Sequence, residues 1–285
     1  MKTILVPIDS GGRGRSLLET AMALAGRFRA HLEVLHIRQD PEEMLHATGM
    51  ALPGSMRRSV LQLGASQADE GAERARALFD EVCAAAGVNQ VEEPPFPDEA
   101  SVVWRDRTGK PSLLVALRGR LADLIVVSRP TDDPRASEVL EAALLETGRP
   151  VLIVPPGPAP ASVGTRIAIG WNGSTVAAKA VMAAAPFLEE AEAIAILTTG
   201  ETRHDQLTAR DLQRHLAWHG MQAEIVTFKE KAGKISGPML SEAHAFGADL
   251  LLLGGYGTSV TRNVILGGVT RAMLEVSDLP LLMAH

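Results

Sequence analysis

Apolar residues along the chain fall into two patterns, which are short continuous runs and longer stretches with helical spacing. Continuous runs such as 123–128 and 249–254 are typical of parallel strands covered on both faces. Stretches such as 59–86 and 135–147 space their apolar residues as amphipathic helices do. Because runs and stretches alternate along the chain, the sequence predicts a doubly wound α/β fold with right-handed crossovers.

The boundaries of the expected elements follow from these two patterns. In the first half we expect strands at 3–8, 32–37, 89–93, 123–128 and 151–154, and helices at 14–29, 59–86, 112–120 and 135–147. In the second half we expect strands at 166–171, 193–198, 223–228, 249–254 and 281–284, and helices at 174–189, 205–219, 235–246 and 268–277.

The two halves of the sequence look like copies of one unit. The opening segment 4–11 matches 167–174, and the later run 122–127 matches 248–253 in the same order. Self-similarity of this kind indicates two domains of the same architecture.

A proline-rich segment at 155–164 separates the two copies and is typical of a semi-rigid linker. It places one domain at 1–154 and the other at 165–285. The first copy is longer, and its surplus lies at about 38–66, where glycines and prolines interrupt an apolar segment. We interpret this segment as a lid or flap packed on the first domain, although a surface insertion that covers core fits equally well.

Composition and charge narrow the classes of function without naming one. Of the 285 residues, 46% are apolar but only 4% are aromatic, so the core must consist of Leu, Val, Ile, Ala and Met. A net charge of −6 gives no global attraction to nucleic acid or to anionic lipid. Without a membrane-length apolar segment or a signal peptide, we expect a cytoplasmic protein that binds no membrane. The single cysteine, Cys83, suits a reducing compartment and is expected to be a small buried residue.

The strongest candidate site follows the run 249–254. Gly254-Gly255-Tyr256-Gly257 lies after a buried strand, and Gly267, Gly268, Val269 and Thr270 open the last expected helix. Glycines let the backbone approach a ligand, and the amides at a helix N-terminus bind anions. Taken alone, this pattern fits phosphate binding and simple tight turns equally well.

The corresponding segment of the first half, 128–134, has a different chemistry. It contains no glycine, and Asp132 and Asp133 stand where phosphate would lie. Carboxylates repel phosphate and prolines lack an N–H donor. We therefore expect no phosphate site of this kind in the first half, and a turn or capping role for the two aspartates rather than a metal site.

Motifs for catalysis and metal binding are weak. The segment Gly11–Ser16 follows the first strand but lacks the third glycine of a dinucleotide fingerprint, and no P-loop occurs. His215 and His219 have the spacing of zinc ligands, although a solvated helix face is the better interpretation. His36 and His285 end apolar strands, where histidines are commonly half exposed. We assign no catalytic residue and no metal site.

Together these features resemble the universal stress protein family in its tandem two-domain form. The resemblance rests on Asp9-Ser10-Gly11 after the first strand, on the Ala-Asp blocks at 122–127 and 248–253, and on the closing strands after Pro150 and Pro280. The second half also resembles the family's nucleotide loop, G-x2-G-x9-G-[ST]. Gly268 takes the place of the hydroxyl residue, for which Thr270 is a nearby substitute.

The resemblance implies a site for ATP or AMP, with Mg²⁺, in the second half. The family's nucleoside-binding Asp is matched by Asp9 in the first half but by Asn172 in the second, and adenine would lie near the end of the second strand. The implied nucleotide-binding residues are Asn172, Leu197, Thr198, Gly254, Gly257, Gly267, Gly268, Val269 and Thr270.

The resemblance also implies an architecture and a role. Two Rossmann-like domains would pair their last strands, 151–154 and 281–284, as an intramolecular pseudo-dimer, and a further homodimer stays open. The implied role is that of a stress-response protein that senses or binds nucleotide with no or very weak hydrolysis. The alternative is a binding module without nucleotide, which uses the apolar flap and the pseudo-dimer surface to engage a protein partner or a small apolar ligand. An enzyme such as a nucleotide hydrolase or transferase is the third hypothesis.

Overall fold

A computed structural model describes most of the chain. The described residues are 1–9, 14–38, 40–42, 45, 53–92, 99–130, 134–200, 207–231, 234–255 and 268–285. By its internal contacts the chain divides into two compact units, Met1–Ala143 and Leu144–His285.

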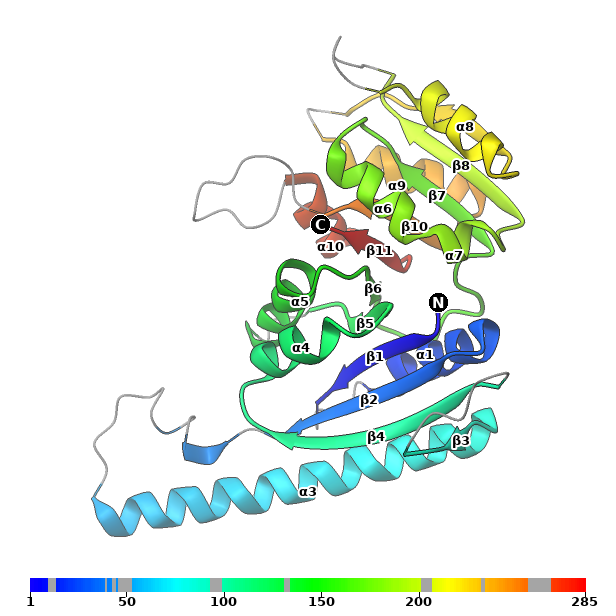
Figure 1. Ribbon diagram of the computed structural model, residues 1–285. Helices are drawn as coiled ribbons and strands as arrows, with labels where there is room; N and C mark the ends of the chain where they lie inside the picture. Colours follow the sequence, from blue (N-terminus) through cyan, green and yellow to red (C-terminus); the bar gives the residue numbers. More distant parts are fainter. Residues whose placement is uncertain are drawn as a thin grey trace. The chain divides into compact units, whose positions relative to one another are not determined.

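Unit 1 is built on parallel strands in the order β3-β4-β2-β1-β5 (Figure 1). The strands are β1 (Thr3–Ile8), β2 (His31–Arg38), β3 (Asn89–Gln90), β4 (Ser101–Thr108) and β5 (Leu124–Ser128), and the helices are α1 (Gly14–Phe28), α3 (Gly54–Ala86), α4 (Pro111–Gly119) and α5 (Pro134–Glu146), which runs on into unit 2. Strand β1 is central and has buried side chains at every position from Ile4 to Ile8, as a strand covered on both faces requires.

Unit 2 has the order β6-β11-β10-β7-β8-β9, in which β10-β7-β8-β9 repeats the order β5-β1-β2-β4 of unit 1. The strands are β6 (Val151–Val154), β7 (Arg166–Gly170), β8 (Ala193–Thr198), β9 (Ala223–Thr227), β10 (Leu250–Gly254) and β11 (Leu281–Ala284), and the helices are α6 (Thr175–Ala183), α7 (Ala185–Leu188), α8 (Ala209–Trp218), α9 (Ser236–Phe246) and α10 (Gly268–Val276). The predicted fold class, tandem doubly wound α/β units with parallel strands, is therefore confirmed.

The expected pairing of the two closing strands is also confirmed. Strands β6 and β11 run antiparallel, with Ile153 opposite Leu281 and Val151 opposite Met283. Every residue of both strands is buried, so the pairing is part of the apolar core.

The repeated Ala-Asp block has a structural role in both units. The Asp123 carboxylate accepts hydrogen bonds from the backbone N–H groups of Lys2 at 2.6 Å and Thr3 at 3.1 Å. The Asp249 carboxylate accepts from the backbone N–H groups of residues 164–166 at 2.9 to 3.1 Å. Each aspartate thus satisfies backbone donors at the start of a strand, β1 in unit 1 and β7 in unit 2.

The prediction of a third strand at 89–93 is wrong. Only Asn89–Gln90 is a strand, and the strand that pairs with β2 along its whole length is β4, Ser101–Thr108. Strand β4 begins with apolar residues but ends in Arg105-Asp106-Arg107, and these charges conceal its second half in the sequence.

The predicted helix 59–86 begins earlier, at Gly54, and so includes the second part of the predicted flap. Residues 53–60 are all exposed, and the first buried residue of the helix is Gly71. The interpretation of 53–66 as a flap packed on the core is therefore wrong, because this segment continues the helix away from the core. The rest of the predicted flap lies largely outside the described residues.

Two further features concern single residues and helix ends. The predicted helix 174–189 is interrupted at Ala184, two residues before Pro186, because a proline cannot donate the next helical hydrogen bond. Cys83 is buried as predicted, and burial raises the pKa of its thiol to about 11.

In the part of the chain that the structure describes, no helix has both the length and the apolar character needed to cross a membrane.

Candidate functional site

The candidate site of unit 2 lies where the winding of its sheet reverses. Strand β7 pairs with β8, where Gly170 lies opposite Leu197, and with β10, where Ile169 lies opposite Leu252. The carboxyl ends of these three strands therefore meet at one edge. In open α/β sheets, ligands bind at the carboxyl edge where the strand order reverses.

Asn172 lies at this edge, directly after β7, and is exposed. Its Oδ1 accepts a hydrogen bond from the backbone N–H of Ser174 at 3.1 Å. The Ser174 hydroxyl in turn accepts from the backbone N–H of Ala177 at 3.3 Å and caps the N-terminus of α6. Asn172 therefore holds the turn into α6 through one acceptor while its side chain stays at the surface.

Leu197 and Thr198 end β8 and are both buried. The Leu197 carbonyl accepts from the backbone N–H of Trp171 at 2.9 Å, and the Thr198 hydroxyl accepts from the backbone N–H of Gly200 at 3.2 Å. Leu197 is therefore a core residue, and Thr198 shapes the turn that follows the strand.

Gly254 ends β10 in close contact with helix α6. A Cβ at this position would lie 2.7 Å from the backbone N of Ala177 and 2.8 Å from the backbone C of Val176, which is closer than real Cβ atoms approach other atoms. The first turn of α6 therefore packs directly on the end of β10. The packing of the fold alone requires a glycine here, whether or not a ligand binds.

Helix α10 supplies the last part of the candidate site. Since α10 connects β10 to the parallel strand β11, its N-terminus lies at the edge where β10 ends. Gly268 is its first residue and is exposed, and no described heavy atom lies within 4 Å of a Cβ built on it. Val269 is half-buried and Thr270 is buried. Gly257 and Gly267 lie outside the described residues.

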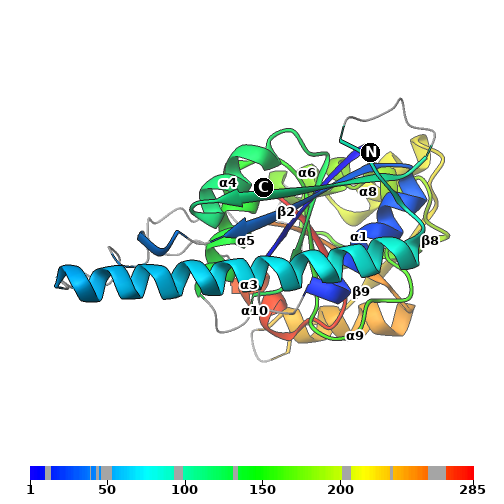
Figure 2. The same ribbon diagram turned by 90° about the horizontal axis from the view of Figure 1, so that it is seen from below.

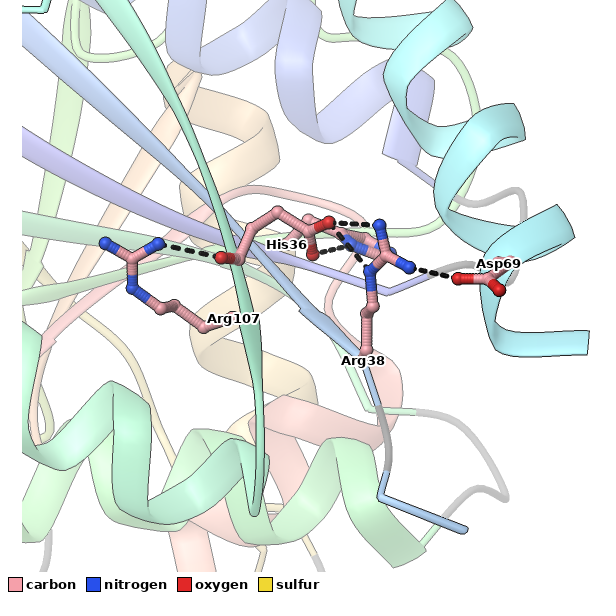
Figure 3. Close-up of polar contacts among 5 residues, drawn as sticks. His36, Arg38, Asp69 and Arg107 are labelled. Atoms are coloured by element: carbon pink, nitrogen blue, oxygen red, sulfur yellow. Dashed lines mark hydrogen bonds and ion pairs between the residues drawn. The ribbon is translucent and has the colours of Figure 1, made fainter. Parts of the chain in front are cut away.

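The corresponding edge of unit 1 carries a cluster of charged side chains (Figure 3). His36 of β2 is fully buried, and its Nδ1 lies 3.0 Å from Asp106 Oδ1 of β4. Arg38 donates from Nε to Asp106 Oδ2 at 2.7 Å and also pairs with Asp69 of α3. Because β2 and β4 pair in register, His36 and Asp106 lie directly opposite each other.

The expectation that His36 would be half exposed is wrong. Its ring stacks on Trp104, with ring centroids 5.4 Å apart and an interplanar angle of 12°, and Trp104 packs in turn on Phe79 of α3. The long helix thus covers this strand end. Sequence reasoning missed the cluster because Asp106 lies in the strand that it did not predict.

The charges of this cluster support one another. Burial opposes ionisation of Asp106, but hydrogen bonds from Arg38 and His36 outweigh it, so the pKa of this carboxyl is below its usual value. The hydrogen bond to Asp106 likewise raises the pKa of the Arg38 guanidinium. An internal ion-pair network therefore lies at the ends of β2 and β4 in unit 1, whereas the described residues that end β7, β8 and β10 in unit 2 are uncharged.

The remaining sequence candidates show no assembled chemistry. His215 of α8 and His219 just after its end are exposed, and their rings meet edge to face with centroids 4.8 Å apart. Within the described ranges, no three His, Cys, Asp or Glu side chains come together as a metal site. Asp132 and Asp133 lie outside those ranges.

Solved structures show the same fold over nearly the whole chain. A universal stress protein from Archaeoglobus fulgidus DSM 4304 matches with a TM-score of 0.69 at 16% identity, over 99% of this chain and 95% of that one. A functionally unknown protein from Pseudomonas aeruginosa PAO1 matches with a TM-score of 0.57 at 16% identity, over 100% of this chain and 92% of that one. Among curated proteins, none matches the sequence significantly.

Sequence comparison assigns the family. The model of the universal stress protein family matches residues 1–155, which is more than half of the chain. This match covers the opening strand with Asp9 and the first Ala-Asp block, on which the resemblance was based. The chain belongs to the universal stress protein family.

Proposed function

We propose that this stress-response protein binds an adenine nucleotide, ATP or AMP, through unit 2. The observation that carries the proposal is the meeting of three strand ends, β7, β8 and β10, with the N-terminus of α10 at one edge. A helix N-terminus offers unpaired amide donors and the positive end of the helix dipole, which together suit a phosphate. The glycine spacing of the family's nucleotide loop, from Gly254 to Gly268, supports the same conclusion.

The proposed site holds phosphate with backbone amides rather than with basic side chains. The predicted residues at this edge are apolar, amide, hydroxyl or glycine residues, so none of them is a general base at neutral pH. We therefore propose binding with no or very weak hydrolysis. Mg²⁺ would enter with ATP and be held mainly by the phosphates, because Asn172 carries no charge.

Substitutions at Gly268 test this proposal without disturbing the packing. The position is exposed and has open space among the described residues, so a small side chain fits. Gly268→Asp places a negative charge at the phosphate site and should weaken ATP binding roughly tenfold or more. Gly268→Asn, which has the same shape without the charge, should weaken it far less.

Gly268→Ser restores the hydroxyl of the family motif and should tighten binding by roughly threefold to tenfold, the effect of one added hydrogen bond. Isothermal titration calorimetry on the full chain measures all four proteins. The proposal is rejected if no protein shows saturable binding at millimolar nucleotide. It is also rejected if Gly268→Asp and Gly268→Asn bind ATP equally well.

A further inference from the structure

Strand β9, labelled in Figure 2, is an edge strand of unit 2. Among the described strands it pairs with β8 alone, in parallel, with Ile225 opposite Ile196. An edge strand presents backbone N–H and C=O groups that no neighbouring strand satisfies. Strand β9 therefore offers a row of hydrogen-bonding groups along its outer side.

The outward groups of β9 are those of Ile225 and Thr227. The backbone N–H of Phe228 donates to the Thr198 carbonyl of β8 at 3.0 Å. Because successive residues of a strand point their backbone groups to alternate sides, those of Thr227 and Ile225 point away from β8. In the described part of the chain, neither residue has a hydrogen-bond partner outside the β8 ladder.

The start of this edge is closed. The Ala223 carbonyl also points away from β8, and it accepts a hydrogen bond from Gln213 Nε2 of α8 at 2.8 Å. An added strand therefore has room to pair from Ile225 onward, toward the carboxyl end of β9.

The side chains of β9 suit pairing with a further strand. Ile225 and Val226 are half-buried and lie on opposite faces of the sheet, so apolar residues of an added strand can pack on both. By contrast, the part of β4 that β3 leaves unpaired includes Arg105-Asp106-Arg107, and charges of this kind discourage strand addition. The only charged residue of β9 is Glu224, at the closed start of the edge.

Three exposed lysines follow this edge, which are Lys229, Lys231 and Lys234, with one acid, Glu230, among them. Their ammonium groups have no ion-pair or hydrogen-bond partner among the residues that the structure describes. The backbone groups of Lys231 and Lys234 bond to each other at 3.0 Å in both directions, which holds these two lysines at the ends of a tight turn. In a chain of net charge −6, this turn is a local concentration of unpaired positive charge.

We propose that β9 and the lysines after it bind an extended acidic segment of a partner protein, which adds to the sheet as a further strand. Backbone hydrogen bonds to Ile225 and Thr227 would supply affinity, and acidic side chains beside the lysines would supply specificity. A second copy of β9 fits less well, because antiparallel pairing centred on Val226 would place the uncharged residues 221–223 beside the lysines.

Fluorescence anisotropy of labelled synthetic peptides, titrated with the full chain, tests the proposal. The probe has three glutamates followed by alternating valine and threonine, and it is also made with the glutamates at the other end to allow parallel pairing. One of the two orders should bind weakly, with a dissociation constant on the order of 100 μM that rises with salt. No saturable binding of either order by millimolar chain overturns the proposal.

Two control peptides separate charge from strand addition. Replacing the glutamates with lysines should weaken binding at least roughly tenfold. Replacing the valines with prolines keeps the charge but prevents pairing as a strand, and should weaken binding by a similar factor. If the proline peptide binds as tightly as the probe, charge alone attracts the peptide and strand addition is wrong.

Charge reversal in the chain tests the role of the lysines. Lys229→Glu together with Lys231→Glu should weaken binding of the glutamate peptide roughly tenfold or more and tighten binding of the lysine peptide. The matched control is Lys179→Glu on α6, an exposed position of the same unit, which should change either affinity by less than about twofold. Equal effects of the two reversals contradict the proposed surface.

Substitution of Thr227 tests the edge itself. Thr227→Pro removes the outward N–H of an exposed residue and leaves the β8 ladder intact, so binding should weaken roughly threefold to tenfold. Thr227→Val keeps the N–H and should bind within about twofold of the wild type. Equal binding by the two variants contradicts pairing along β9.

Hydrogen exchange gives a readout independent of affinity. The bound probe should protect the amides of Ile225 and Thr227 in the wild type, because these N–H groups become hydrogen-bonded. Binding without this protection contradicts strand addition. Protection that arises in the chain alone and increases with its concentration would indicate a second copy on the edge, and would overturn the proposal.

Discussion

Gly254 is expected to tolerate no larger side chain, because α6 packs on it. The Cβ of Gly254→Ala would lie 2.7 Å from the backbone N of Ala177 and 2.8 Å from the backbone C of Val176. Both are backbone atoms, so no side chain can rotate away and the helix itself must shift. The matched control is Gly268→Ala, whose Cβ meets no described atom within 4 Å.

Overpacking of this kind typically costs about 1–3 kcal/mol of unfolding free energy. For a protein of this size, roughly 2–4 °C is lost per kcal/mol, so the melting temperature of Gly254→Ala should fall by about 2 to 12 °C. Gly268→Ala, at an exposed position, should change the unfolding free energy by less than about 0.5 kcal/mol.

Urea unfolding followed by circular dichroism measures the free energy, and hydrogen exchange of the β10 amides shows whether the loss is local. Because the chain has two units, exchange also shows which of them is affected. A Gly254→Ala chain as stable as the wild type would refute the close packing of α6 on β10. If Gly268→Ala destabilises the chain as much as Gly254→Ala does, steric overlap at Gly254 is not the cause of the loss.

Three further predictions concern single residues. Burial opposes ionisation of Asp123, but backbone N–H donors at the start of β1 lower the pKa of its carboxyl, so Asp123→Asn should cost about 1 kcal/mol, mostly above about pH 5. In urea titrations this difference should disappear as the pH falls through the lowered folded pKa of the carboxyl. Asp106→Asn should cost about 1–3 kcal/mol because it removes the negative charge and one of the two oxygens that pair with Arg38 and the buried His36, and thermal melts measure the loss. Cys83, with a pKa of about 11, should resist alkylation at pH 8 in the folded chain and react once urea unfolds it.

Most of the fold could be predicted from the sequence, because its strands are continuous apolar runs. The runs at 123–128 and 249–254 can be identified as buried parallel strands because their apolar residues are continuous rather than alternating. The repeat of the Ala-Asp block indicated two copies, and the structure shows that the aspartate is repeated because it satisfies backbone donors. The repeat is visible in the sequence because both units need this aspartate for the same kind of hydrogen bond.

Strand β4 could not be predicted, because its position depends on its neighbours. Its second half, Arg105-Asp106-Arg107, has the pattern of a solvated segment, yet it pairs in register with His36 and Arg38. The charged end of β4 is stable in a strand because Asp106 pairs with the buried His36 and with Arg38, which also pairs with Asp69. That arrangement joins residues of three elements, which no local window of the sequence contains.

The sequence predicts which residues lie at the carboxyl edge of unit 2, but not what each of them contacts there. The sequence pattern assigns Gly254 to ligand binding, and the structure gives it a packing role that explains the glycine without a ligand. The resemblance places Leu197 beside adenine, and the structure shows a buried residue whose carbonyl accepts a hydrogen bond from Trp171. Sequence patterns locate the edge of the sheet, but burial and close contacts decide what each residue does there.

The stoichiometry of nucleotide binding tests the central claim most directly. In a calorimetric titration of the full chain with ATP, we expect saturable binding of one nucleotide per chain. Unit 2 provides the strand ends and the helix N-terminus, whereas in unit 1 the segment 128–134 after β5 contains no glycine and the Arg38–Asp106 pair lies at the ends of β2 and β4. Gly268→Asp should weaken this binding and Asp106→Asn should leave it unchanged. No saturable binding at millimolar ATP, or binding that Asp106→Asn abolishes while Gly268→Asp does not affect it, would contradict the assignment of the site to unit 2.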